Sequence, residues 1–184
     1  MALLLREDRI TQLSDAQLIV EVARGDTQAL ALLYRRYAHE LLAVAYRVLQ
    51  TRADAEDVVH DVFVGLPEAV RRYEERGALG GWLRKVTARV ALMRLRQDSA
   101  RGKEPLDHTN EPAASNTADE AITIERALQQ LSPGLRAVLV LKEIEGFSHA
   151  EIADLLDISV AASEVRLHRA LRRLRALLIQ DRSL

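Results

Sequence analysis

The chain has 184 residues, of which 48% are hydrophobic, 29% charged and only 4% aromatic, and its formal net charge is −1. Glycine and proline are scarce, at 8 and 4 residues, which favours helices over strands. The absence of cysteine excludes a disulfide framework, a thiolate zinc site and a cysteine nucleophile. The apolar run at the N-terminus is too short for a signal peptide, and no stretch approaches the roughly 18 apolar residues that span a bilayer, so a cytoplasmic protein without membrane insertion is expected.

Residues 14–50 are predicted to form two helices. Ser14 or Asp15 can cap the first of them, and Gly25 with Asp26 separates the two. The apolar residues that recur at steps of three and four, and that predict the buried faces, are Leu18, Val22, Leu30, Leu33, Tyr37, Leu41, Val44 and Val48.

A third helix is predicted to begin near Thr51, which stands at capping-box spacing from Asp54, and Pro67 is expected to perturb it without ending it. Three glycines among residues 73–81 predict a loop. A fourth helix is expected from Trp82 to about Arg96. The inward-facing residues of this helix are predicted to be Leu83, Val86, Val90 and Leu95.

Residues 98–120 lack apolar periodicity and predict a flexible linker. Acidic residues outnumber basic ones by 7 to 3 over residues 98–126, whereas the counts nearly balance before them (15 basic, 13 acidic) and after them (8 basic, 7 acidic). The sequence therefore predicts an all-α protein with two small helical domains, residues 1–97 and 121–184, joined by an acidic linker.

The second domain carries the pattern of a helix-turn-helix. Ser132 and Pro133 predict a helix start, and Gly146 a helix end. Ser148 and Glu151 form a capping box before a short helix over 151–156. A tight turn at 157–159 and a long helix to about residue 179 follow, which is the layout that places a second helix in the DNA major groove.

Two residues fit this motif for physical reasons. Ala153 is small enough to let the two helices cross closely, and Asp157 tolerates the left-handed conformation that such turns need. The DNA-facing side of the last helix is predicted to hold Ala161, Ala162, Ser163, Glu164 and Arg166, continued by Arg169, Arg172, Arg173 and Arg175 as a strip for phosphates. The alternative is an ordinary helical hairpin with a solvated, arginine-rich helix.

Two segments resemble a known family. Ala53-Asp-Ala-Glu-Asp-Val-Val-His-Asp-Val-Phe-Val, followed by Trp82-Leu83, looks like region 2 of the sigma-70 family of RNA polymerase initiation factors. Leu131-Ser-Pro-Gly-Leu-Arg, Gly146-Phe-Ser-His-Ala-Glu-Ile-Ala and Val165-Arg-Leu-His-Arg-Ala look like region 4. The order of these motifs, with no domain between them, resembles the extracytoplasmic-function (ECF) group.

The resemblance implies a surface for core RNA polymerase. Asp54, Asp57, His60 and Asp61 match the family's docking surface for the β′ clamp helices. His60 stands where the family usually has Gln, so we expect the docking to depend on pH. The same residues could be an ordinary solvated helix face, and a metal site is disfavoured because no further ligand cluster accompanies them.

The resemblance also implies a surface that opens the promoter −10 element. A melted strand needs a pocket for an unstacked base and cations along its backbone. The residues that match are Arg71, Arg72, Tyr73, Arg84, Lys85, Arg89, Arg94 and Arg96. We expect Trp82 to be a core anchor in preference to a stacking platform. Arg89 and Met93 depart from the Asn and Asp common in relatives, which leaves the −10 base preference open.

Region 4 would hold the −35 element as duplex and contact the polymerase β flap. The −35 residues implied are Ser159, Ala162, Ser163, Arg166, Arg169 and Arg173. Relatives commonly carry Thr and Lys where this chain has Ala162 and Glu164. We therefore expect weaker −35 contact, or Glu164 accepting a hydrogen bond from a cytosine amino group.

The function expected is promoter-specific transcription initiation through binding alone, with no enzyme activity, cofactor or metal, since the five histidines form no triad or metal motif. Relatives are often held inactive by an anti-sigma factor, which is an expected partner beside core polymerase and promoter DNA. Two alternatives stay open: a sigma mimic that occupies an anti-sigma factor, and a stand-alone helix-turn-helix regulator.

Overall fold

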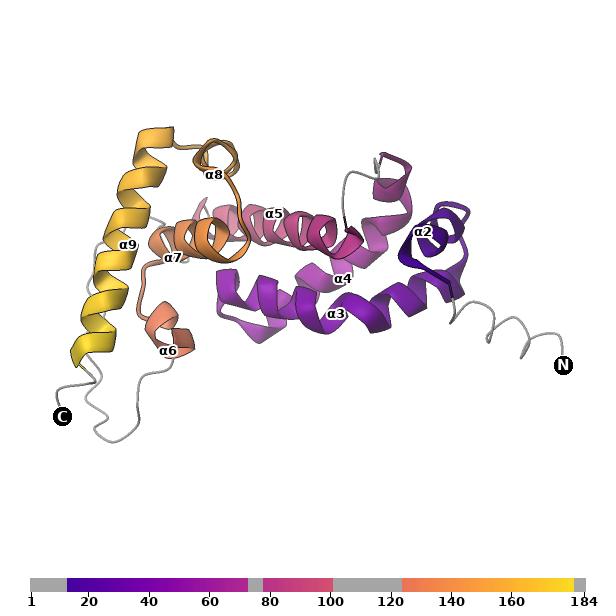
Figure 1. Ribbon diagram of the computed structural model, residues 1–184, viewed down its shortest axis with the longest axis horizontal. Coiled ribbons are helices and arrows are strands. Elements are labelled where there is room, and N and C mark those ends of the chain that lie inside the picture. The colour runs from indigo at the N-terminus through magenta and orange to yellow at the C-terminus, as the bar shows by residue number, and fades with distance from the viewer. Residues whose placement is uncertain (1–12, 73–77, 101–123, 181–184) are drawn as a thin grey trace, which may run out of the picture. The chain divides into compact units, whose positions relative to one another are not determined.

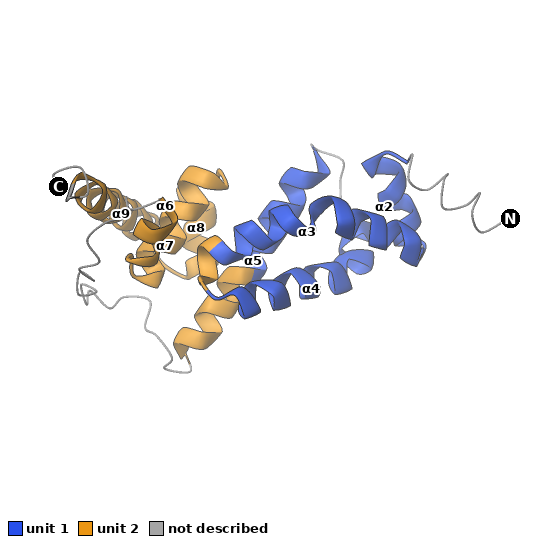
Figure 2. Ribbon diagram, turned by 90° about the horizontal axis from the view of Figure 1, so that it is seen from below, with its two compact units in different colours: residues 1–46, 51–90 blue, residues 47–50, 91–184 orange. Residues whose placement is uncertain are grey.

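The computed structural model describes residues 13–72, 78–100 and 124–180, and every regular element in these ranges is a helix (Figure 1). The chain divides into two compact units (Figure 2). The first comprises residues 1–46 and 51–90, the second residues 47–50 and 91–184. None of the helices in the described ranges combines the length and apolar character needed to cross a membrane.

The helices of the first unit pack around one core. They are α2 (Asp15–Ala23), α3 (Thr27–Leu49), α4 (Arg52–Ala69), the 3₁₀-helix η1 (Val70–Arg72) and α5 (Leu79–Ala100). The end of α3 and the second half of α5 fall in the second unit. The predicted domain boundary at residue 97 lies inside α5 and stays a prediction. The largest fully buried side chains of this core are Leu18, Val22, Leu33, Leu41, Leu66 and Leu83.

The predicted start of the first helix and the break after it are confirmed. Ser14 and Gln17 form a capping box, in which the Ser14 N–H donates to Gln17 Oε1 over 2.9 Å. Gly25, with φ +87°, separates α2 from α3. Thr51 does precede α4, where the Ala55 N–H donates to its carbonyl over 3.0 Å. The predicted cap there is wrong in one respect, because the Thr51 side chain makes no capping hydrogen bond.

Residues 79–81 of the predicted loop are helical, and residues 73–77 lie outside the described residues. Pro67 lies inside α4 without ending it, as expected. The fourth helix begins at Leu79 and not at Trp82, so Gly80 lies in its first turn. Leu79 is buried in the core, which offsets the poor helix propensity of glycine. A Cβ at Gly80 would lie 3.0 Å from Tyr37 Cε1, so this glycine lets α5 approach α3 closely.

The second unit is built around α9. Its helices are α6 (Ile124–Gln129), α7 (Pro133–Leu139), the π-helix η2 (Val140–Ile144), α8 (His149–Leu156) and α9 (Val160–Gln180), and α9 packs against α6, α7 and α8. Pro133 opens α7 as predicted, but the Ser132 side chain makes no capping hydrogen bond. The π-helix was not predicted, because one widened turn leaves no mark on apolar periodicity. The first three residues of the predicted linker, 98–100, belong to α5. The rest of it, residues 101–120, lies outside the described residues.

The helix-turn-helix prediction is confirmed. Ser148 and Glu151 form the capping box, and α8 begins two residues earlier than predicted. Asp157 adopts the left-handed conformation, with φ 55° and ψ 50°, and the Ile158 N–H donates to the Ala153 carbonyl over 3.0 Å. Ser159 Oγ then accepts from the Ala162 N–H over 3.0 Å and caps α9.

Candidate interaction surfaces

The outer face of α4 is acidic. Helix α4 buries Val58, Val59, Val62, Phe63 and Leu66, and the four predicted docking residues lie on its other side. Among these four, Asp57, His60 and Asp61 are exposed and Asp54 is half-buried. The spacing of three and four residues brings the exposed three together on one face.

Ion pairs flank this acidic face at both ends. Arg52 Nε lies 2.8 Å from Glu56 Oε1, and Arg71 Nη1 lies 3.1 Å from Glu68 Oε2. Both pairs join a basic to an acidic side chain, and the same face carries the carboxylates of Asp54, Asp57 and Asp61. A surface of this sign and exposure suits a basic partner.

The cations predicted for the −10 element do not all share one face. Lys85, Arg89 and Arg96 stand four and seven residues apart along α5 and lie on one side of it, whereas Arg84 and Arg94 point elsewhere. Arg84 Nη1 lies 3.2 Å from Glu40 Oε1, in a pair that is half-exposed on both sides. Arg71 and Arg72 are in η1, the Arg72 side chain is not described, and Tyr73 lies outside the described residues.

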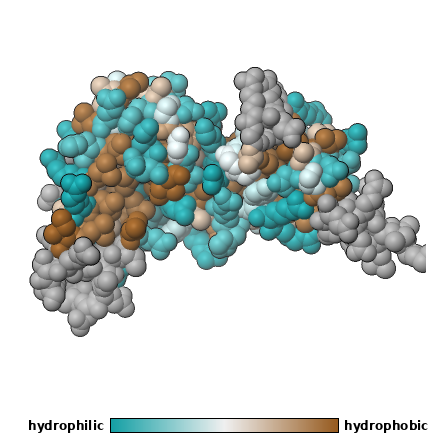
Figure 3. All heavy atoms as spheres, in the orientation of Figure 1, coloured by the Kyte–Doolittle hydropathy of each residue, from teal (hydrophilic) through white to brown (hydrophobic). Residues whose placement is uncertain are grey.

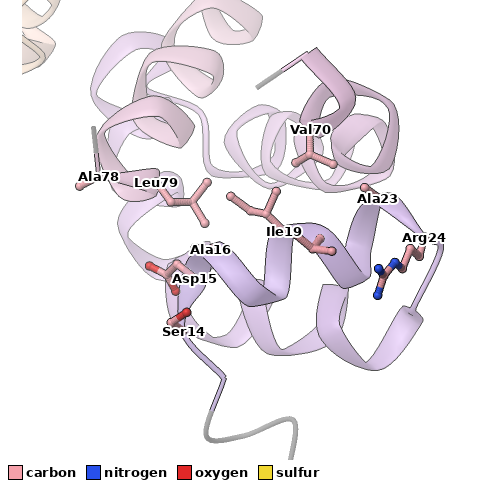
Figure 4. A pocket seen from close by; sticks show the side chains of 10 residues that line it. Ser14, Asp15, Ala16, Ile19, Ala23, Arg24, Val70, Ala78 and Leu79 are labelled. Carbon is pink, nitrogen blue, oxygen red and sulfur yellow. The ribbon is translucent and has the colours of Figure 1, made fainter. Parts of the chain in front are cut away.

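Trp82 is half-buried and packs against the core of the first unit, as predicted for a core anchor. A cavity of about 640 Å³ opens near the start of α5, between α2, Val70 of η1 and Leu79 (Figure 4). Ile19, Val70 and Leu79 give it an apolar wall.

The polar groups of that cavity are already engaged. Asp15 accepts from Arg36 over 2.8 Å and from the Tyr37 hydroxyl. Burial and this hydrogen bond raise the pKa of Tyr37 to about 12. Arg24 at the other end pairs with Glu21 over 2.9 Å. The cavity therefore offers chiefly apolar surface, and its polar groups serve the junction of α2 and α3.

A buried hydrogen bond joins the two helices of the helix-turn-helix. His149 Nδ1 lies 2.9 Å from Ser163 Oγ, and Ser163 is fully buried. His149 is half-buried, so it is held between the two helices and is not a freely solvated surface residue. Ala153 is also buried, consistent with the close crossing predicted for it.

The six residues predicted to contact the −35 element lie on different sides of α9. Ser163, Ala170 and Leu177 define its buried side. Of the predicted residues, Ser159 and Arg169 are exposed, Ala162, Arg166 and Arg173 are half-buried, and Ser163 is inaccessible. The exposed side opposite the core instead carries Ala161, Glu164, Val165, His168, Arg169 and Arg172. Val165 and His168 were not predicted to lie on this exposed side. They stand four and seven residues after Ala161, a spacing that places them on the same helix face.

The second unit also exposes apolar side chains. Figure 3 displays a group of them beside α9, and Ile124 of α6 and Leu171 of α9 are among the exposed large apolar residues of the chain. Exposed apolar groups of this kind mark a surface suited to protein contacts.

Two family models match the chain. The family described as sigma-70 region 2 matches residues 33–101, and sigma-70 region 4 matches residues 121–174. The ECF RNA polymerase sigma factor SigM of Mycobacterium tuberculosis is 31% identical over 167 residues, which cover 90% of this chain and 85% of SigM. The RNA polymerase sigma-H factor of Pseudomonas aeruginosa is 30% identical over 180 residues, covering 88% of this chain and 92% of that protein.

Solved structures are similar as well. CnrH, solved in complex with the cytosolic domain of CnrY, aligns with a TM-score of 0.52 and 27% identity over 91% of this chain and 98% of CnrH. The sigma factor RpoE of Bartonella quintana, solved with the anti-sigma factor NepR, has the same TM-score at 22% identity and shares the fold. This alignment covers 76% of this chain and 89% of RpoE.

The chain therefore belongs to the sigma-70 family of RNA polymerase initiation factors. Within that family its two regions and its relatives belong to the ECF group, and its function is to direct transcription initiation.

Proposed function

We propose that this sigma factor works through three surfaces, one for core polymerase and two for promoter DNA. The first is the acidic face of α4, which docks on the β′ clamp helices through Asp54, Asp57, His60 and Asp61. The observation that carries this assignment is the exposure of Asp57, His60 and Asp61 together on one side of a helix whose other side is core. Exposed charges of one sign speed and orient the encounter with an oppositely charged partner.

The second surface holds the melted −10 strand. Lys85 and Arg89 form a line of cations along α5, and Arg71 lies in η1 before the loop. Arg96 continues this line but is already engaged, because its guanidinium donates to the Leu155 carbonyl over 3.2 Å and to Asp157 Oδ2 over 3.4 Å. The ion pairs of Arg71 and Arg84 are solvent-exposed, and such pairs contribute only about 0–1 kcal/mol, so phosphate can displace their carboxylates. Arg72, Tyr73 and Arg94 remain proposed members of this surface.

The third surface is α9, which lies in the major groove of the −35 duplex, while region 4 also contacts the β flap. Its exposed Arg169 and Arg172 suit phosphates, and its N-terminal half presents base-reading positions. Ser159, Ala162, Arg166 and Arg173 flank this side, whereas Ser163 supports it from within.

We further propose two small domains, predicted over residues 1–97 and 121–184, in a cytoplasmic protein that binds without catalysing a reaction. The flexible linker, predicted over 98–120, would begin only after α5 ends at Ala100. The two family matches leave residues 102–120 between them, which supports a linker there. The relative CnrH is bound by the cytosolic domain of CnrY, which supports a regulatory partner here, expected to be an anti-sigma factor.

Three single-site variants test these assignments separately. Asp61→Lys should weaken binding to core polymerase and leave region 4 folded. Arg89→Ala should keep core binding and reduce open-complex formation, read by permanganate reactivity of unpaired thymines. Arg169→Ala should weaken binding to duplex −35 DNA alone. A chain that binds core polymerase yet never forms an open complex on any promoter would instead be a sigma mimic.

A further inference from the structure

One polar pair is buried where α8 meets α9. Ser163, on the buried side of α9, is inaccessible to solvent, and its Oγ lies 2.9 Å from Nδ1 of His149, the first residue of α8. Burying a hydroxyl costs free energy that a hydrogen bond only offsets. An apolar side chain of similar size would pack at this helix crossing without that cost, so packing alone does not account for the pair.

The hydrogen bond selects which nitrogen of the His149 ring carries the proton. Within the described residues, His149 Nδ1 is the one hydrogen-bond partner of the Ser163 hydroxyl. A neutral imidazole has one N–H and one nitrogen that accepts. If Nδ1 accepts from the hydroxyl, both groups are satisfied and the ring proton lies on Nε2. If Nδ1 donated instead, the buried hydroxyl proton would have no acceptor, which is rare in folded proteins.

The other ring nitrogen of His149 is open to an external partner. His149 is half-buried, and its Nε2 has no hydrogen-bond partner within the part of the chain that the structure describes. Some side-chain atoms in the described ranges are both buried and without a partner, as Thr87 Oγ1 is, but His149 Nε2 is not one of them. Nε2–H is therefore a donor whose ring is held on one side and accessible on the other.

The position of His149 indicates which acceptor this donor meets. Helix α8 is the first helix of the helix-turn-helix, and Ser163 lies in the N-terminal part of α9. In docked proteins of this class the first helix crosses the DNA backbone while the second lies in the major groove. Backbone phosphate oxygens accept hydrogen bonds from side-chain N–H groups. Glu151, the nearest acid along α8, is engaged by the cap, because it accepts from the Ser148 N–H over 2.8 Å.

We propose that His149 donates a hydrogen bond from Nε2 to a backbone phosphate of the −35 duplex, and that Ser163 is the positioning residue that fixes this tautomer and the orientation of the ring. The inference rests on the proposed function of α9 as the −35 surface. The donor is neutral, unlike Arg169 and Arg172, so the contact adds affinity without releasing a counterion. Ser163, which the sequence predicted as a direct contact, acts on DNA through His149.

The tautomer can be read directly in the full chain. Nitrogen-15 NMR shifts of the imidazole rings, recorded at mildly alkaline pH, distinguish Nδ1–H from Nε2–H, and the signals lost in His149→Asn identify His149. We expect a single Nε2–H form in the unmodified chain and a mixture of both forms in Ser163→Ala. The Tm of Ser163→Ala should change by no more than about 4 °C. An Nδ1–H form in the unmodified chain would overturn the inference.

Two variants of His149 separate the two ends of the ring. The side-chain amide of Asn lies as many bonds from the backbone as Nδ1, and the amide nitrogen of Gln as many as Nε2. The probe is a duplex that the unmodified chain selects from a random pool. We expect His149→Asn to keep Tm and bind this duplex about tenfold more weakly, whereas His149→Gln regains most of the affinity. The salt dependence should stay the same in both, while Arg169→Ala lowers the log–log slope by about one.

Neutral methylphosphonate groups, placed singly along the same duplex, locate the acceptor. At one phosphate the replacement should weaken binding of the unmodified chain and cause no further loss in His149→Asn, because both changes remove one contact. His39→Asn changes an exposed histidine of α3, and Thr87→Val another fully buried hydroxyl residue. Both lie in the first unit and should leave −35 binding unchanged.

Normal duplex binding by His149→Asn, while Arg169→Ala binds poorly, would overturn this inference and leave α9 as the proposed −35 surface. Additive losses at every phosphate in His149→Asn would also overturn it. Failure of the unmodified chain to bind any duplex would remove the proposed −35 function and this inference together.

Discussion

Helices α4 and α9 are both amphipathic, yet their outer faces differ in sign. Helix α4 buries a row of Val, Phe and Leu and exposes Asp57 and Asp61, whereas α9 buries Ala170 and Leu177 and exposes Arg169 and Arg172. The buried faces account only for the packing of each helix into its core. The outer faces distinguish their partners, because an acidic face repels the DNA backbone and a basic one attracts it.

The largest effect is expected when the charge of the α4 face is reversed from negative to positive. Asp57→Lys with Asp61→Lys should reduce affinity for core polymerase by about a hundredfold or more, since two attractive charges become repulsive. Binding of region 4 to duplex DNA should not change. Equilibrium binding to fluorescent core polymerase measures the effect, with Glu21→Lys on α2 as control. Unchanged affinity of the double variant would mean that α4 is not the docking face.

A bulky residue between α8 and α9 should instead affect only the DNA side. Ala153→Leu overpacks the buried crossing and should lower the free energy of unfolding by about 2 kcal/mol. Duplex −35 binding should be lost, while core binding through α4 persists. Thermal unfolding and DNA binding are the readouts, and Ala150→Leu, at an exposed position of α8, serves as control. Equal stability of both variants would contradict a close helix crossing.

Changes of charge on α9 test how this helix contacts promoter DNA. Glu164→Lys should tighten promoter binding several-fold and steepen its dependence on salt by about one unit in the log–log slope, whereas Arg169→Ala should lower that slope by about one. Titrations of promoter DNA at several salt concentrations measure both, with Glu143→Lys in η2 as control. If Glu164→Lys brings no gain and loses one base preference, Glu164 reads a base and does not simply repel phosphate.

The smallest expected effect concerns the junction of α2 and α3. The pKa of Tyr37, raised to about 12 from the usual 10, makes its neutral form stabilising below pH 10, and this contribution is lost as pH rises from about 10 to 12. Tyr37→Phe should lower stability at pH 7 by about 1 kcal/mol and flatten the loss of stability above pH 10. Urea unfolding at several pH values measures it, with Tyr34→Phe as control. Identical profiles for Tyr37→Phe and the unmodified chain would exclude a stabilising bond to Asp15.

Local signals predicted much of the fold, mainly where a side chain forms a hydrogen bond with the backbone a few residues away. The cap at Ser14, the capping box at Ser148 and the left-handed turn at Asp157 could be predicted because each signal lies within about four residues. The start of α5 was misjudged, since burial of Leu79 and the contact of Gly80 with Tyr37 depend on residues about 40 positions away. The same limit applies to the surfaces. The side of α9 that faces outward depends on how it packs against α7 and α8, so Ser163 was predicted as a contact although it is buried.

The most direct measurement is transcription in vitro, with the purified chain and core bacterial RNA polymerase on a pooled library of promoter fragments. The account predicts specific transcripts that disappear without the chain and that disappear again with the Asp57→Lys, Asp61→Lys variant. Their shared upstream sequences would define the −10 and −35 elements. No chain-dependent transcript, together with no binding to core polymerase, would contradict it.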